Sequence, residues 1–347
     1  MITATKAHQE LRVARAEPGD PYWDEFVRRS PDGTVCHLSG WRRIVEDVLG
    51  REYIPLVAVT LDGEWKGILP LVRVRAPLLG HSLISMPYVN YGGPLGTVEA
   101  QRTLITTAIG EARSSGAQVL QLRQRSSMEG FAATARKIAV VLDLPQRREE
   151  LWARFPSKLR SQIRRPMKEG MEFRIGVEQL EPFYRVYARN MRDLGTPVYP
   201  LDFFTELAAT FPEVSFGAVY YRGRAIGAGA GFLWNGEFEI TWASCIREYN
   251  PLAPNMLLYW SFMGEMIERG AVTFNFGRST PGTGTHRFKQ QWGGRDTPLA
   301  WVEWSSRLQS PTSPSLAVRA ASAVWQHLPL AVANRLGPPL ARRLPWW

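Results

Sequence analysis

Cysteine is scarce in this 347-residue sequence, which contains only Cys36 and Cys245. Two cysteines cannot build the disulfide framework of a small secreted domain, so their number fits a reducing compartment. Neither the cysteines nor the five histidines show the spacing of metal ligands. The sequence therefore predicts a protein without a metal site.

Long apolar runs are also missing. The first 20 residues lack the apolar core of a signal peptide, and no stretch approaches the ~18 apolar residues of a membrane span. We expect a cytoplasmic protein, or one in peripheral contact with the inner membrane.

Two known catalytic patterns are absent too. No Lys-Ser/Thr follows the glycines at 92, 93 and 96 to complete a phosphate loop, and no Gly-x-Ser-x-Gly elbow occurs.

Apolar residues and positive charge are abundant. A hydrophobic content of 45%, with 13 tryptophans, excludes a disordered chain. The 42 basic and 32 acidic residues give a net charge of +10. Such a charge predicts an acidic partner, which is nucleic acid, a phosphorylated substrate or anionic lipid, and charge alone does not choose among them.

The order of predicted elements repeats along the chain. Helices come first, then a hairpin of antiparallel strands, a final helix and a closing strand, once in residues 1–145 and again in residues 146–308. We predict an α/β (α+β) protein with two units of mixed, mainly antiparallel sheet flanked by helices, in which residues 300–304 complete the second unit. The hairpin turns are marked by Asp62-Gly63, Arg222-Gly223 and Asn235-Gly236.

The stretch 272–294 is the strongest candidate for a functional site. It begins as an alternating strand that Gly277 is expected to end, and a mobile loop rich in glycine and proline follows. Two cations held near a strand end are costly unless something anionic binds there. We therefore predict an anion site here. Its polar residues are Arg278, Ser279, Thr280 and Lys289.

Residues 147–170 form a predicted basic helical region. Its apolar residues recur at three- and four-residue spacing, while Lys158, Arg160 and Arg164 lie largely off that stripe. The basic face is either solvated or binds an anion, and both interpretations stay open. Pro166 is expected to end or kink the helix.

A second polar cluster is expected where a helix over residues 177–194 ends at Gly195, a natural C-cap. Capping explains the glycine but not the charged pair beside it. The polar residues at this helix end are Asn190, Arg192, Asp193 and Thr196.

The last segment, residues 309–347, is predicted to be a linker followed by a basic amphipathic tail. From residue 316 onward it contains four arginines and no aspartate or glutamate. A segment of this kind either lies on an anionic membrane surface or packs on the body of the protein, and we favour packing.

Five segments resemble one protein family. They are KLRSQIRRPMKEG (158–170), NMRDLGTPVYP (190–200), WASCIREYNPLAPNMLLYW (242–260), FNFGRST (274–280) and FKQQWGG (288–294). Together with the repeated element order, they resemble the paired Gcn5-related N-acetyltransferase (GNAT) domains of the Fem peptidyltransferases. Within that superfamily, they look like the FemAB-related proteins that accompany PEP-CTERM/exosortase and exopolysaccharide systems.

The resemblance implies two tandem GNAT-like domains and acyl or aminoacyl transfer to an amine. The acceptor would be a phosphorylated or lipid-linked precursor of the cell envelope or of an exopolysaccharide. Lys289 matches a Fem lysine that stabilises charge around the transferred carbonyl, and Arg278 would hold a phosphate or carboxylate. Asp193 or Asn190 could orient the amine.

The acyl donor stays open between aminoacyl-tRNA and acyl-CoA, and we expect it as a co-substrate with no bound cofactor. The segment NPLAPNMLLYW stands where GNAT enzymes carry a glycine loop before the helix that faces the acyl-CoA pyrophosphate. This departure argues against ordinary acetyl-CoA use. No coiled-coil arm for tRNA is encoded. The residues flanking that helix, as further donor-binding candidates, are Tyr249, Asn250 and Asn255.

Two alternatives remain at this point. One is an acyl-CoA-dependent N-acyltransferase acting on an amino sugar. The other is a degenerate GNAT module without catalysis that docks on membrane or RNA. His286, close to Lys289, is most simply a loop histidine and is kept as a weak catalytic candidate.

Overall fold

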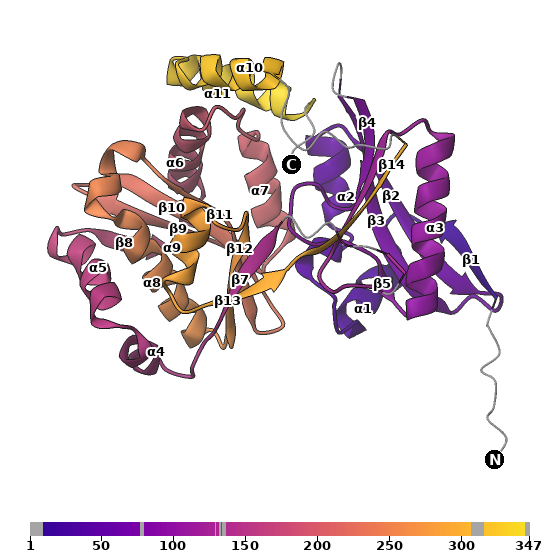
Figure 1. The fold of residues 1–347 in the computed structure, drawn as a ribbon, viewed down its shortest axis with the longest axis horizontal. Helices are drawn as coiled ribbons and strands as arrows, with labels where there is room; N and C mark the ends of the chain where they lie inside the picture. Colours follow the sequence, from indigo (N-terminus) through magenta and orange to yellow (C-terminus); the bar gives the residue numbers. More distant parts are fainter. Residues whose placement is uncertain are drawn as a thin grey trace.

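The computed structural model describes residues 10–76, 80–128, 130, 131, 133, 137–306 and 316–343. These residues form two seven-stranded mixed sheets that lie side by side, each flanked by helices, with the helices of the tail above the second sheet (Figure 1). This arrangement confirms the predicted fold class.

The first sheet has the order β1-β2-β3-β4-β6-β14, with β5 paired to β3. Only β4 and β6 are parallel. Alternate residues of a strand point to opposite faces, so Ile54 and Leu56 pack toward helix α3 while Tyr53 and Val57 join the core on the other face. The strands are β1 (Leu11–Arg15), β2 (Glu52–Thr60), β3 (Trp65–Ala76), β4 (Gly80–Ile84), β5 (Leu95–Gly96), β6 (Val119–Gln124) and β14 (Ala300–Ser305). The helices are α1 (Pro21–Arg29), a 3-10 turn (Val35–His37), α2 (Trp41–Arg43) continued by a π-helix (Ile44–Val48), and α3 (Val98–Ser114).

The second sheet has the order β13-β7-β12-β11-β10-β9-β8, and only β11 and β12 are parallel. Both predicted hairpin turns are confirmed, because positive φ at Asn235 and Gly236, as at Arg222 and Gly223, gives the turn that matches strand twist. The strands are β7 (Ile138–Asp143), β8 (Glu172–Ile175), β9 (Val214–Tyr221), β10 (Arg224–Trp234), β11 (Glu237–Cys245), β12 (Thr273–Ser279) and β13 (Arg295–Pro298). The helices are α4 (Arg148–Arg154), α5 (Ser157–Lys168), a 3-10 turn (Val177–Gln179), α6 (Leu180–Asp193), α7 (Leu201–Thr210), a 3-10 helix (Arg247–Leu252), α8 (Pro254–Glu268) and α9 (Gly284–Gln290).

One hydrophobic core joins the two sheets. Trp41 of the first unit lies 5.3 Å from Phe211 and 6.2 Å from Phe232 of the second, measured between ring centroids. The indole nitrogen of Trp234 also donates to the Gly33 carbonyl at 2.8 Å. The seam between the sheets is therefore a packed interface that can hold polar groups in fixed positions.

Each sheet contains one strand that the sequence assigned to the other unit. The sequence predicted that β14 completes the second unit, and this prediction is wrong. β14 pairs with β6 of the first sheet along its whole length. β7 lies in the second sheet between β12 and β13. The β6 edge offers unpaired backbone groups, and β14 satisfies them. The domain limits at residues 145 and 308 stay predictions. β7 precedes the first limit but belongs to the second sheet, and β14 follows it but belongs to the first sheet.

Pro166 does not end its helix. α5 continues through this buried proline to Lys168. A proline lacks a backbone N–H, so the helix loses one hydrogen bond near its end. The buried packing of the proline ring offsets this loss.

The tail packs on the body, as favoured by the sequence. Helices α10 (Leu316–Gln326) and α11 (Leu330–Ala341) lie against α6. The contact is close, since a Cβ on Gly337 would stand 3.0 Å from Val198. Among the described residues, no helix has the length and apolar character needed to cross a membrane.

Candidate active site at the seam between the sheets

The candidate site lies where the parallel strands β11 and β12 separate. Their pairing covers only residues 237–239 and 273–275. Gly277 does not end the strand as predicted. Its φ of +67° instead creates an irregularity in the pairing with β7, and β12 continues to Ser279. A Cβ at Gly277 would lie 3.0 Å from the Ile240 carbonyl oxygen, so glycine permits this close approach.

A buried polar network crosses the seam at this point. Asn275 of β12 donates to the Tyr91 hydroxyl and to the Glu237 carboxylate, at 3.0 Å in both cases. Arg125, the residue after β6, pairs with Glu237 and stacks over the Tyr91 ring. Both units therefore build this network, so their relative position sets its geometry.

Glu239 lies at the centre of the seam. Its carboxylate accepts a hydrogen bond from the Asn90 side-chain amide, which comes from the first unit. Burial raises the pKa of Glu239 from an ordinary value of 4.5 to about 7, opposed by Asn90 and reinforced by the neighbouring Glu237. A carboxyl group with this pKa can accept or release a proton near neutral pH.

Lys289 lies close enough to Glu239 for the two charges to interact. It is carried by α9, a helix where the sequence predicted a mobile loop, and Thr283 caps that helix. Its ammonium donates to the carbonyl oxygens of Gly277 and Arg278, both at 2.9 Å. Burial lowers the pKa of Lys289 to about 8, with Glu239 opposing the shift and Arg278 adding to it.

Two arginines approach one indole ring beside this pair. The guanidinium carbons of Arg123 and Arg278 lie 4.5 Å and 5.7 Å from the Trp301 ring centroid. Arg123 donates to the carbonyls of Pro87 and Val89, at 2.7 Å each, while its Nη2 has no hydrogen-bond partner among the described residues. Burial lowers the pKa of both guanidinium groups, and the positive charge of Arg278 adds to the shift at Arg123. Two like charges, one buried and one half-buried, are expensive when held together, and an anion between them would relieve the cost.

Comparison with known proteins bears on this region. Residues 153–290 match the family model described as an acetyltransferase (GNAT) domain. This segment is a GNAT-fold domain. It runs from α4 to α9 and contains Glu239, Arg278 and Lys289. No curated protein matches the chain.

Solved structures show the same fold over most of the chain. FemX superposes with a TM-score of 0.63 at 14% identity, over 85% of this chain and 97% of FemX. The C-terminal domain of a protein assigned as a lysylphosphatidylglycerol synthetase from Agrobacterium fabrum gives 0.57 at 12% identity, over 92% of this chain and 95% of that domain. A tandem GNAT protein from the clavulanic acid biosynthesis pathway gives 0.56 at 11% identity, over 87% and 100%. At these identities the likeness concerns the fold, and it supports two GNAT-like domains.

The polar residues predicted around the end of β12 come together in the GNAT domain. Ser279 is buried, and its hydroxyl has no hydrogen-bond partner among the described residues. The Thr280 hydroxyl accepts from the Lys137 ammonium at 2.7 Å. His286 is not a loop residue, because it lies buried in α9 and contacts Asp296 at 3.0 Å, a contact that fixes this helix to β13. Their roles as site residues stay predictions.

The cluster at the end of α6 lies elsewhere. Asn190 donates to the Ser244 hydroxyl at 3.1 Å, and Ser244 is five residues beyond Glu239 on β11, a separation of roughly 17 Å along the strand. Arg192 pairs with Asp193 at 2.8 Å and donates to the Leu328 carbonyl of the tail. The backbone N–H of Thr196 donates a hydrogen bond to the Met191 carbonyl. Of this cluster, Arg192 and Asp193 line a cavity of about 410 Å³ next to the tail, together with Arg189, Arg247, Glu248, Gln326 and His327.

The remaining candidates lie around α8 and α5. Tyr249 and Asn250 belong to the 3-10 helix before α8, and Ala253 takes a left-handed φ of 56° at the start of α8. The Asn255 side-chain oxygen is buried without a hydrogen-bond partner among the described residues. The exposed Lys158 and Arg164 and the half-buried Arg160 lie on α5, away from the first sheet (Figure 1). All six stay predictions.

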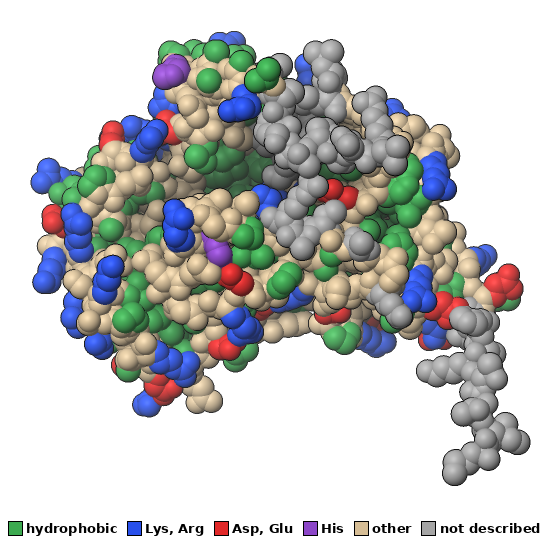
Figure 2. Space-filling model, viewed as in Figure 1, with side chains coloured by type: hydrophobic (Ala, Val, Ile, Leu, Met, Phe, Trp, Pro, Cys, Tyr) green, Lys and Arg blue, Asp and Glu red, His purple; other side chains and the backbone are tan. Residues whose placement is uncertain are grey.

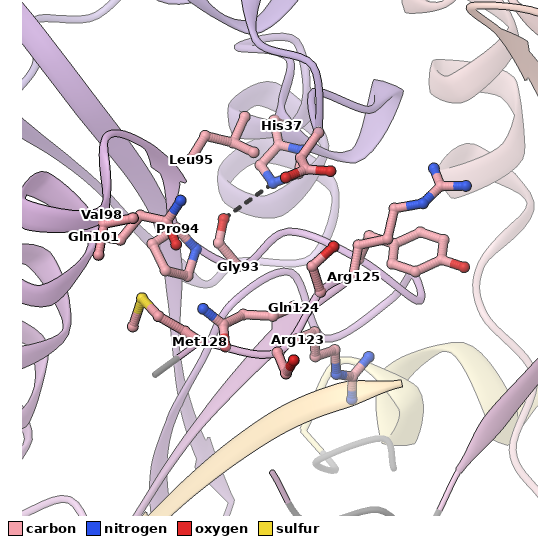
Figure 3. Close-up of a pocket in the computed structure, with 14 residues that line it drawn as sticks. His37, Gly93, Pro94, Leu95, Val98, Gln101, Arg123, Gln124, Arg125 and Met128 are labelled. Atoms are coloured by element: carbon pink, nitrogen blue, oxygen red, sulfur yellow. Dashed lines mark hydrogen bonds between the residues drawn. The ribbon is translucent and has the colours of Figure 1, made fainter. Parts of the chain in front are cut away.

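A second cavity, of about 210 Å³, adjoins the network inside the first unit (Figure 3). Its lining includes Gln124 and Arg125 from the end of β6 and the loop at Gly93 and Pro94. Burial lowers the pKa of His37 to about 4, so its neutral ring donates to the Gly93 carbonyl at 3.0 Å. In the described part of the chain, no three His, Cys, Asp or Glu side chains are grouped to hold a metal ion.

Sequence reasoning missed Glu239, Glu237 and Arg123. A signal was present in each case, because a buried strand contains a charged residue at an alternating position. Glu237 and Glu239 flank Phe238 in β11, and Arg123 follows Leu122 in β6. Charges inside such strands require partners or ligands.

Proposed function

We propose that this protein is an acyltransferase or aminoacyltransferase that forms an amide on an amine, with Glu239 and Lys289 as its catalytic pair. The observation that carries the proposal is this buried carboxyl and ammonium pair, whose pKa values of about 7 and about 8 are shifted toward each other. The pair lies in the segment that matches the GNAT model. Groups poised near neutral pH at a seam between domains favour proton transfer.

The chemistry follows from these two groups. The amine nitrogen attacks the acyl carbon, forming a nitrogen–carbon bond, and Glu239 accepts the proton that the amine loses. An ammonium has three N–H donors, two of which Lys289 gives to the Gly277 and Arg278 carbonyls. The third stabilises the developing oxyanion. The carbon–oxygen or carbon–sulfur bond to the leaving group then breaks, and the leaving group takes up a proton.

We further propose that the acceptor carries a phosphate or carboxylate, which Arg278 holds with support from Arg123. An envelope or exopolysaccharide precursor, phosphorylated or lipid-linked, has this chemistry. The start of α8, with Pro254 and a left-handed Ala253 in place of glycines, favours an aminoacyl ester over acyl-CoA as the donor.

The test is a transfer assay on the full chain with a panel of donors: acetyl-CoA, longer acyl-CoAs and charged tRNA, with UDP-amino sugars as acceptors. We expect Glu239→Gln to lower the rate by about 10²–10⁴-fold. The control is Glu172→Gln, since Glu172 is exposed on β8 at the far edge of the same sheet. An unchanged rate in both Glu239→Gln and Lys289→Met would exclude this pair from catalysis.

Thermal shift distinguishes the donors. A ligand at about 100 times its dissociation constant stabilises the fold by about 2.7 kcal/mol. Stabilisation by CoA thioesters would favour an N-acyltransferase acting on an amino sugar. Absence of transfer with every donor, combined with binding to RNA, would favour a module without catalysis.

A further inference from the structure

The outer side of the tail is the part of the molecule where exposed apolar side chains concentrate. Of the twelve exposed large hydrophobic residues in the described part of the chain, five lie in α10 and α11, with 37% to 81% of their surface accessible. Figure 2 shows apolar side chains on the outward side of these helices, at the top of the view. The five residues are Leu316, Val324, Val332, Leu336 and Leu340.

Packing on the body leaves a substantial part of these side chains exposed. The buried residues of α11 are small: Ala333, Gly337 and Ala341, at a spacing of four. Val332, Leu336 and Leu340 follow the same spacing one position earlier and form a separate stripe on the helix. The tail thus has two faces, one of small residues toward α6 and one of large apolar residues toward solvent. A contiguous apolar surface of this kind marks an interaction site.

Charge identifies the partner. Residues 316–347 contain Arg319, Arg335, Arg342 and Arg343 but no aspartate or glutamate, and all four arginines are exposed. Apolar side chains flanked by arginine alone match a surface of acyl chains beneath phosphate groups. A second copy of this chain would instead bring eight arginines together without one carboxylate.

We propose that α10 and α11 form a docking surface for an anionic phospholipid bilayer. The stripe of Val332, Leu336 and Leu340 enters the boundary between headgroups and acyl chains, and the arginines contact lipid phosphates. The helices have 11 and 12 residues, so they lie in the plane of the surface and do not cross it. This surface acts independently of the proposed transfer reaction.

The test is co-sedimentation of the full chain with vesicles of phosphatidylcholine alone or with about 30% phosphatidylglycerol. We expect binding to the anionic vesicles, weakened by salt, and at least tenfold weaker binding for the triple variant Val332→Ser, Leu336→Ser, Leu340→Ser. The matched control is Leu61→Ser, Val177→Ser, Val272→Ser, which removes three apolar side chains elsewhere that are more exposed than the three replaced in the tail and should bind like wild type. Circular dichroism checks that both variants fold.

Three outcomes would overturn the proposal. One is the absence of binding to anionic vesicles, and another is equal binding by the tail variant and the wild type. The third is a concentration-dependent dimer, seen by light scattering and abolished only in the tail variant, which would show that a second copy covers this face.

Discussion

Replacing Glu239 by glutamine should stabilise the protein relative to wild type as the pH rises. Glutamine keeps the shape and can still accept a hydrogen bond from Asn90, but it does not ionise. In the wild type, the folded state keeps a proton on Glu239 up to a pH of about 7, whereas the unfolded chain releases it near 4.5. The unfolded state therefore binds fewer protons between these values, and wild-type stability falls as the pH rises through this window.

The magnitude follows from the size of the pKa shift. A rise from 4.5 to about 7, at 1.36 kcal/mol per pH unit, corresponds to about 3 kcal/mol. The difference in unfolding free energy between Glu239→Gln and wild type should be constant below pH 4.5 and grow in favour of the variant through the window. It should level off above pH 7, where Glu239 is ionised in both states of the wild type.

The assay is urea unfolding followed by tryptophan fluorescence from about pH 4 to pH 8. Glu172→Gln serves as the control, because its exposed carboxyl group should leave the difference flat. A flat difference for Glu239→Gln as well would mean that Glu239 ionises at its ordinary pKa in the folded protein. The assignment of a base at this position would then be withdrawn.

Three further predictions concern the same site. The transfer rate should rise through pH about 7 as Glu239 loses its proton and fall above about 8 as Lys289 loses its own, and a rate that keeps rising past pH 9 would contradict the pairing. Lys289→Met should lower the rate by about 10²–10³-fold and remove the alkaline limb of the pH–rate profile; retention of that limb would assign it to another group. Gly277→Ala should cost at least about 1–2 kcal/mol in urea unfolding, since it adds a Cβ at positive φ next to the Ile240 carbonyl. The control is Gly282→Ala, at φ +77° in open space, which measures the cost of a positive φ without crowding. An equal loss of unfolding free energy in both variants would show that crowding at Gly277 is negligible.

Local signals in the sequence predicted most of the elements correctly. Arg222-Gly223 turns the chain between β9 and β10, and Asn235-Gly236 turns it between β10 and β11. In both cases the decisive contacts lie within a few residues. This is why a single sequence contains enough information to predict them.

The errors concern contacts between distant residues. No local pattern near Ala300 indicates that β14 pairs with β6, about 180 residues earlier in the sequence. The segment after Gly277 has the composition of a loop, yet contacts such as His286 with Asp296 hold it as a helix. The charge of Glu239 within an apolar strand is a local signal, but its partner Asn90 belongs to the other unit, so no local pattern indicates where the carboxyl group lies.

The exchange of β7 and β14 between the sheets affects how the protein folds during synthesis. β6 needs β14 on its outer edge, and the 175 residues that separate these strands take roughly 9–35 s to translate at ~5–20 residues per second. The nascent first sheet presents an open strand edge for that time, which makes it a target for chaperones or for misassembly. A chain that stops before residue 300 would keep this edge open permanently.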